Sequence, residues 1–209
     1  MPAELPPDLA RLLHDLRGPL NSLTMHTEVL ARSAGADRVA EDSARTVRDQ
    51  LVRLSAMLTD AFALAALELG SVAPVELGGV IEAARAEAGG PVDVTGGRWP
   101  AVVGDAALLT LALGHLLRNA VEAGRDGGRP PRVSAAVEGG EALVRVQDCG
   151  PGLRTTDPKL LIRPWHSSKP GHRGLGLVTV ERVARLHGGA LRFATSPDGA
   201  LVTLALPTR

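Results

Sequence analysis

The first third of the chain carries apolar residues at steps of three and four, which is the spacing of one face of an α-helix. One such series runs from Leu9 to Leu30, and a second runs from Val47 to Ala65. The segment 33–37 separates them with small and polar residues. This pattern predicts two long helices joined by a tight loop, an antiparallel helical hairpin. A hairpin cannot bury both sides of its apolar seam alone. We therefore expect two copies to form a homodimer, a four-helix bundle; packing of the hairpin on its own second domain is the alternative.

Around residues 70–74 the helical pattern stops, and short β-like runs then alternate with helical runs. The helical runs are 107–123 and 175–187. The runs typical of strands are 91–94, 100–103, 132–137, 142–148, 190–195 and 200–207. Most of these strands follow one another across short turns, which favours a mainly antiparallel sheet with helices on one face. The fold class predicted is α+β, with a helical domain at 1–70 and a second domain at 71–209.

The segment 153–174 shows no clear periodicity and contains Pro158, Pro164 and Pro170. It is too long for an ordinary connection between elements, so we expect a mobile functional loop.

The composition of the chain excludes several classes of function. The 209 residues are 44% hydrophobic and 22% charged, which is ordinary for a soluble globular protein. A formal net charge of +0 argues against a general nucleic-acid or membrane-surface binder. No apolar stretch approaches the roughly 20 residues of a membrane span, and the N-terminus lacks the order of a signal peptide. We expect a cytoplasmic protein without direct membrane insertion. The one cysteine, Cys149, excludes an internal disulfide and a multi-cysteine zinc site.

His14 lies near the apolar stripe of the first helix but off its centre, where its imidazole can reach solvent. Asp15 follows it, and Pro19 lies five residues beyond. A neutral imidazole is a competent nucleophile, and an adjacent carboxylate can accept the proton that it loses. The alternative is that Gly18 ends one helix, a second begins at Pro19, and His14 is an ordinary surface residue.

A second group of residues indicates a nucleotide site. An apolar strand ends on Asp148 and is followed by Gly150 and Gly152; a second glycine turn, Gly174 and Gly176, comes directly before a helix. The carboxylate can accept a hydrogen bond from a base amine. The glycines allow close approach of the backbone, and the helix offers free N–H groups to phosphates.

Further polar residues extend this group. Asn119, on the helix 107–123, could ligate Mg²⁺ through its side-chain oxygen. Lys169, His172 and Arg173 are candidate contacts to a triphosphate. Each of these residues alone has an ordinary structural explanation: a surface asparagine, a capping aspartate, turn glycines or a solvated cluster of charges. Their order along the chain favours the nucleotide site.

Five motifs in the same order and spacing resemble those of sensor histidine kinases of two-component signalling, and the resemblance covers nearly the whole chain. HDLRGPL resembles the phosphoacceptor H-box, LLRNAVEA the N-box, DCGPG the G1 box and GLGL the G2 box, and IRPWHSSK is similar to the F-box. The resemblance implies a dimeric helical hairpin followed by a Bergerat-type α/β sandwich ATPase domain, with a lid at about 153–174. It implies Mg²⁺ and ATP as phosphoryl donor, and an ATP-dependent protein histidine kinase.

The resemblance also implies roles for individual residues. His14 would be autophosphorylated with Asp15 as proton acceptor, and the phosphoryl group would pass to an aspartate of a response-regulator receiver domain. Asp148 would bind the adenine amine, and Asn119 the metal. The remaining ATP-binding residues would be Gly150, Gly152, Lys169, Gly174, Leu175, Gly176 and Leu177.

The sequence departs from the family pattern at several positions. Gly18 stands where the family often has asparagine or threonine, which predicts weak phosphatase activity toward the regulator. His115 replaces the first N-box asparagine, and Glu122 replaces a residue that is often basic; both changes would weaken ATP or metal binding. Trp165 stands where the F-box commonly has phenylalanine.

Two other functions stay open. A histidine phosphotransferase adaptor with a degenerate ATP site would relay phosphate between receivers through His14. A serine kinase of the anti-sigma type would share the ATPase domain without needing the H-box.

Overall fold

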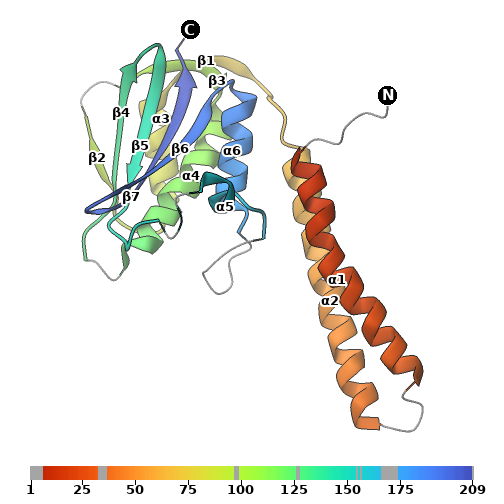
Figure 1. Cartoon of the computed structure of the whole chain (residues 1–209). Coiled ribbons are helices and arrows are strands. Elements are labelled where there is room, and N and C mark those ends of the chain that lie inside the picture. Colours follow the sequence, from red (N-terminus) through yellow and green to blue (C-terminus); the bar gives the residue numbers. More distant parts are fainter. Residues whose placement is uncertain are drawn as a thin grey trace. The chain divides into compact units, whose positions relative to one another are not determined.

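The computed structural model describes residues 7–32, 37–96, 99–125, 128–153, 155, 157–165 and 174–208. The chain divides into two compact units, residues 1–66 and 67–209 (Figure 1). Two helices make up the first unit, and the second combines helices with β-strands.

The first unit is a hairpin of α1 (Pro7–Arg32) and α2 (Asp37–Ala65), as the apolar periodicity predicts. Leu16, Met57 and Ala61 are buried where the two helices pack together. Helix α1 continues through Pro19, so the alternative in which a new helix begins there is wrong.

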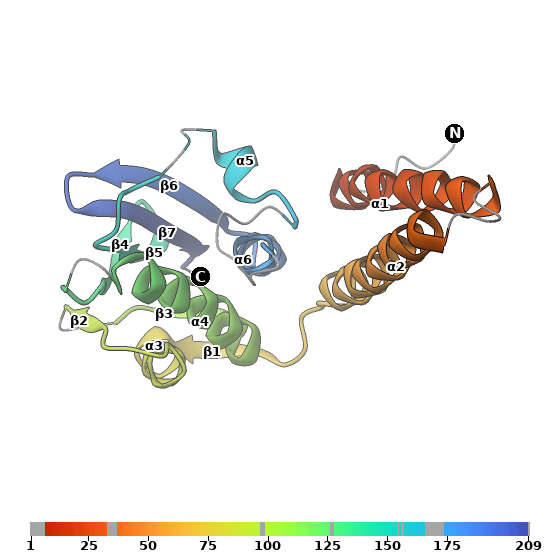
Figure 2. The same cartoon turned by 90° about the horizontal axis from the view of Figure 1, so that it is seen from below.

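The second unit is an α+β layer, which confirms the predicted fold class. Five strands form a sheet in the order β2-β4-β5-β7-β6, in which only the β2–β4 pair is parallel. Helices α3, α4 and α6 lie on the same side of this sheet (Figure 2). Strands β1 and β3 form a separate antiparallel pair. In chain order the elements are β1 (Val72–Glu76), α3 (Leu77–Ala86), β2 (Asp93–Thr95), β3 (Ala101–Asp105), α4 (Ala106–Ala123), β4 (Arg132–Glu138), β5 (Glu141–Gln147), α5 (Pro158–Leu161), α6 (Gly176–Leu186), β6 (Ala190–Ser196) and β7 (Gly199–Pro207).

Leucine, valine and alanine fill the space between helices and sheet. Helix α4 directs a continuous apolar face inward through Leu109, Leu113, Leu116 and Leu117, which are almost fully buried. Burial of one such leucine stabilises the fold by about 1.5–3 kcal/mol. This packing fixes the rotation of α4, and therefore the direction in which its polar residues point.

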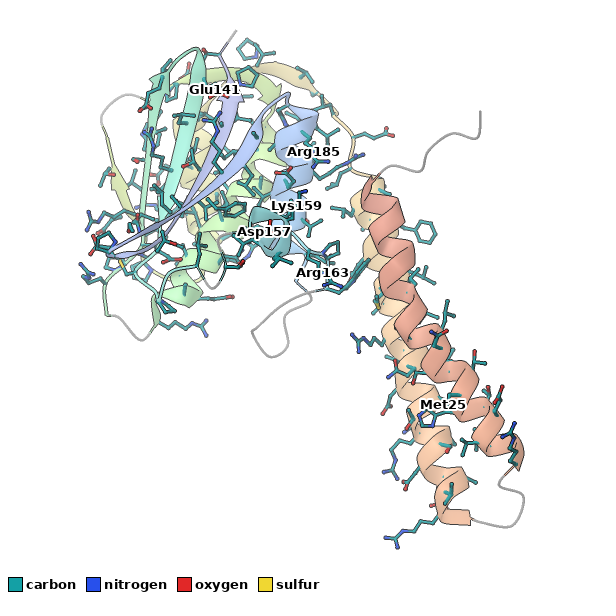
Figure 3. The ribbon with its side chains drawn as sticks, viewed as in Figure 1. Met25, Glu141, Asp157, Lys159, Arg163 and Arg185 are labelled. Atoms are coloured by element: carbon teal, nitrogen blue, oxygen red, sulfur yellow. The ribbon has the colours of Figure 1, made fainter. Side chains whose placement is uncertain are left out.

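The other face of the sheet carries several charged side chains. On β7 the fully buried Leu204 faces the helices, so its neighbour Thr203 faces the opposite way. Thr203 is paired with Arg145 on one side and Arg192 on the other. The Arg192 guanidinium lies 2.7 Å from the carboxylate of Glu141, a residue labelled in Figure 3. These arginines lie across the sheet from α4.

Asp105 holds the start of α4 and a neighbouring part of the chain. Its Oδ1 accepts hydrogen bonds from the N–H groups of Ala107 and Leu108, and its Oδ2 accepts one from Gly70 at 2.8 Å. Its own N–H donates to Nε2 of the buried His187. The N–H groups of Leu108 and Gly70 are the main cause of a lowered pKa for the Asp105 carboxyl, and His187 contributes.

We expect Asp105→Ala to destabilise the second unit by about 1–3 kcal/mol, because it removes a helix cap and leaves the Gly70 N–H without its acceptor. Both tryptophans, Trp99 and Trp165, lie in this unit, so urea unfolding followed by tryptophan fluorescence reports on it. Since the folded pKa lies below the unfolded value, the stabilisation is present above about pH 4 and is lost as the pH falls through the folded pKa. Asp93→Ala, at an exposed position on β2, is the control. A difference between Asp105→Ala and wild type that stays constant down to pH 2 would contradict the assignment.

Candidate nucleotide-binding site

The site begins on the half-buried face of α4. His115, Arg118 and Asn119 lie three and four residues apart, and therefore on one side of the helix. Leu116, Leu117 and Ala120 occupy the buried side.

The first residue of α6 lies directly against these polar side chains. A Cβ added to Gly176 would be 3.4 Å from His115 Nδ1 and 3.5 Å from the Asn119 side-chain nitrogen. The preceding Leu175 gives the helix no side-chain cap, and Gly174 has a left-handed φ of 70°. The first turn of α6 thus offers N–H groups to an anion beside the amide of Asn119.

Only one of the two carboxylate oxygens of Asp148 accepts hydrogen bonds from the described part of the chain. Its Oδ1 accepts hydrogen bonds from the N–H groups of Gly150 at 3.1 Å and Ala200 at 2.7 Å. Its backbone N–H donates to the carbonyl of Ala200. Within the described part of the chain, no donor reaches Oδ2. The half-buried carboxylate is therefore fixed in orientation and retains one oxygen as an acceptor.

Close contacts or a left-handed backbone explain the glycines around Asp148. A Cβ on Gly150 would lie 2.6 Å from the carbonyl oxygen of Ala123, so this turn packs against the end of α4. Gly152 has a left-handed φ of 83°. A side chain on Gly199 would collide with Asp148 Oδ1. Gly199 could not be identified as a site residue from the sequence, because a glycine in a tight turn between strands needs no functional explanation.

Arg118 and His115 form a pair that the sequence analysis did not predict. The Arg118 Nη2 lies 3.2 Å from His115 Nδ1. A guanidinium can only donate, so Nδ1 accepts and the ring proton is on Nε2. Burial of the ring, with a smaller contribution from Arg118, lowers the pKa of His115.

The segment 153–174 is described in part. It contains the short helix α5, and Figure 3 labels Asp157 just before this helix, Lys159 on it and Arg163 after it. Trp165 has a left-handed φ of 53°, and its buried indole N–H finds no acceptor among the described residues. Such strain in a residue without glycine's freedom is common at ligand-binding segments. Lys169, His172 and Arg173 lie outside the described residues.

His14 and Asp15 lie on α1, in the first unit. The described part of the structure includes their backbone but not their side chains. The nucleotide-site residues come from α4, the turn after β5 and the start of α6, all in the second unit.

Residues 104–209 match the family of histidine kinase-, DNA gyrase B- and HSP90-like ATPases. The chain belongs to this family. It is 33% identical over 219 residues to the signal transduction histidine-protein kinase/phosphatase MprB of Mycolicibacterium smegmatis, which covers 93% of this chain. The chain spans 44% of that relative's length. The resemblance to sensor histidine kinases is thereby confirmed.

A solved structure supports the same assignment, and a second shows the same fold. The ATP-binding domain of PrrB from Mycobacterium tuberculosis matches with a TM-score of 0.55 and 25% identity, over 67% of this chain and 99% of its own. The Acinetobacter baumannii histidine kinase AdeS matches over 94% of this chain and 98% of its own, with a TM-score of 0.59. Its identity is 19%, so that match shows the fold alone. No helix in the described ranges has the length and apolarity to cross a membrane.

Proposed function

We propose that this chain is the catalytic part of a two-component histidine kinase, which uses ATP to phosphorylate His14 and passes the phosphoryl group to an aspartate of a response-regulator receiver domain. The observation that carries the proposal is the carboxylate of Asp148, of which only one oxygen is already hydrogen-bonded. One oxygen is held by two backbone N–H groups, and the other remains an acceptor, as recognition of an adenine amine needs.

The residues around Gly176 fit the phosphates and their metal. The uncapped first turn of α6, with Gly174, Leu175 and Leu177, would bind phosphate oxygens through backbone N–H groups. The Asn119 side-chain oxygen would hold Mg²⁺, a cation that prefers oxygen ligands. When bound, Mg²⁺ neutralises part of the phosphate charge. Gly150 keeps the turn after Asp148 close to the end of α4, and Gly152 gives that turn its left-handed backbone.

In the proposed reaction, a nitrogen of the His14 imidazole forms a bond to the γ-phosphorus. The bond from that phosphorus to the bridging oxygen breaks, and ADP leaves with its electron pair. The proton on the other ring nitrogen passes to the Asp15 carboxylate. Positioning and electrostatic stabilisation supply most of the acceleration.

The hairpin has the exposed apolar surface that a homodimer would bury. Phe62 on α2 is 71% exposed, and Met25 on α1, labelled in Figure 3, is 56% exposed. Other large apolar side chains exposed on the two helices are Leu20, Val39, Leu51, Val52 and Leu58. A four-helix bundle of two hairpins would cover such residues.

Two other functions use parts of the same chain. A histidine phosphotransferase adaptor would need His14 but no ATP. That function would not explain the carboxylate oxygen of Asp148 that is free to accept a hydrogen bond. A serine kinase of the anti-sigma type would use the ATP site but not His14.

Labelling with γ-³²P-ATP separates these functions. The kinase is expected to acquire label that is lost in acid and stable in alkali, as phosphohistidine is. Acid-stable label would support the serine kinase. If the protein binds ATP but takes up no label, autophosphorylation is overturned; if it takes label only from a phosphorylated receiver domain, it is the adaptor.

We expect Gly18→Asn to raise phosphatase activity toward the phosphorylated regulator, because the side chain would position water near the phosphoryl group. Gly18 is exposed on α1, and a Cβ there meets no atom within 4 Å. The substitution should also stabilise the helix by about 0.5 kcal/mol, since glycine is a poor helix former. The measurement is the decay of a receiver domain that has been phosphorylated by this kinase. Gly18→Ala is the control, and equal decay with both variants would argue against the assignment of position 18.

A further inference from the structure

The guanidinium of Arg118 points toward the N-terminus of α4. Its Nη2 donates to His115 Nδ1, and a Cβ on Gly114 would lie 3.4 Å from its Nη1. The group therefore lies over the helical turn that precedes Arg118.

This position places a full positive charge close to the start of α6. The His115 nitrogen that accepts from Arg118 is also the atom nearest to the Cβ that Gly176 would have. Gly176 is the first residue of α6, whose N–H groups attract anions. The cation and the helix terminus thus face the same small region, next to Asn119.

Arg118 is half-buried and has no anionic partner in the described ranges. Arg85, Arg145 and Arg192 each lie 2.7 Å from a carboxylate, whereas no described carboxylate is within 4 Å of Arg118. A partly buried cation without a counter-ion is costly unless an anion binds beside it.

We propose that Arg118, positioned by His115, contacts the β- and γ-phosphates of the bound nucleotide and supplies charge neutralisation in place of a second asparagine at position 115. This inference rests on the proposed use of ATP and adds a residue and a mechanism to it. His115 acts as a positioning residue and not as a metal ligand, because its Nδ1 lone pair is used by Arg118 and its Nε2 carries the proton.

Two consequences distinguish this arrangement from a site that depends on metal alone. Affinity should rise with the number of phosphates, even when magnesium is chelated. It should also depend on an acceptor at position 115. A glutamine can accept from Arg118 through its side-chain oxygen, whereas a leucine of similar size cannot.

The test measures binding of adenosine, ADP and ATP by competition with a fluorescent nucleotide, with Mg²⁺ and with EDTA. Arg118→Ala should weaken ATP binding about 10–100-fold in EDTA and ADP binding less, and leave adenosine unchanged, as expected for loss of charge-assisted hydrogen bonds. Arg118→Lys should retain part of the affinity. His115→Leu should weaken ATP binding, and His115→Gln should restore it. Arg192→Ala removes the same charge across the sheet and should bind like wild type.

Adenosine affinity also reports whether each variant is folded. Equal loss of adenosine and ATP by Arg118→Ala and Arg118→Lys would show a structural role and overturn the inference, as would unchanged ATP affinity in Arg118→Ala. In both cases wild-type binding leaves the proposed function standing. If the wild-type protein binds no adenine nucleotide, the proposed function fails and this inference fails with it.

Discussion

Replacing His14 with alanine is expected to abolish acid-labile labelling from γ-³²P-ATP, by at least about 10³-fold, while ATP binding stays within about twofold of wild type. Labelling is lost because alanine has no nucleophile for the phosphorus, and no other group can take over a reaction that depends on positioning. Binding is retained because every residue assigned to the nucleotide lies in the second unit, whereas His14 lies in the first. The measurements are label per chain and affinity for a fluorescent nucleotide.

The matched control is His26→Ala, which removes another histidine from the same helix α1. It should label like wild type. Label that persists on the His14→Ala protein would remove His14 from the role of phosphoacceptor. Loss of label from both variants would indicate that the hairpin itself had been disturbed.

The sequence predicted the long elements well, because their apolar patterns extend over several turns or residues. Helices α1 and α2 follow the two apolar series, and α4 and α6 follow the two later ones. The sequence pattern does not predict β1 or α3. Strand β1 contains Pro74, and α3 begins with leucine and two glycines and has only ten residues, so local propensity gives little signal for either. Tertiary packing decides their structure: a Cβ on Gly78 would press against Trp99, and β1 pairs with β3.

The residues of the candidate site could be predicted where they are close together in the sequence. Asp148 and its glycines occur within five residues, and the helix after Gly174 and Gly176 follows directly. What the sequence could not show was contact across long separations. Ala200 anchors the carboxylate of Asp148 from 52 residues away, and Gly199 leaves room for it.

The Arg118–His115 pair was missed for a different reason. The two residues are close in sequence, but an arginine three residues from a histidine on a helix is usually a solvated neighbour. Only the burial of the ring and the proximity of Gly176 make the pair significant. The same contacts give His115 a positioning role, whereas the sequence alone indicates that this residue weakens ATP or metal binding.

Replacing Asp148 with asparagine is expected to weaken ATP binding about 100-fold or more without unfolding the protein. The asparagine carbonyl oxygen can still accept from Gly150 and Ala200, so the turn keeps its anchors. The other oxygen becomes an NH₂ group, which places a donor opposite the donor of the adenine amine. Loss of one hydrogen bond and the mismatch of two buried donors together account for an effect of about this size. Competition binding with ATP, and urea unfolding to verify the fold, are the measurements.

The same change should alter which purine is preferred, and this outcome separates base recognition from a general loss of affinity. Inosine triphosphate has an oxygen where ATP has the amine, so an NH₂ group at position 148 can donate to it. We expect the ratio of ATP to ITP affinity to fall in Asp148→Asn relative to wild type. Asp198→Asn, at the exposed turn between β6 and β7, should leave the ratio unchanged. An equal loss for both nucleotides in Asp148→Asn would place Asp148 in the scaffold of the site. A fall in the ratio, following the donor and acceptor pattern of the base, identifies the Asp148 carboxylate as the group that recognises adenine.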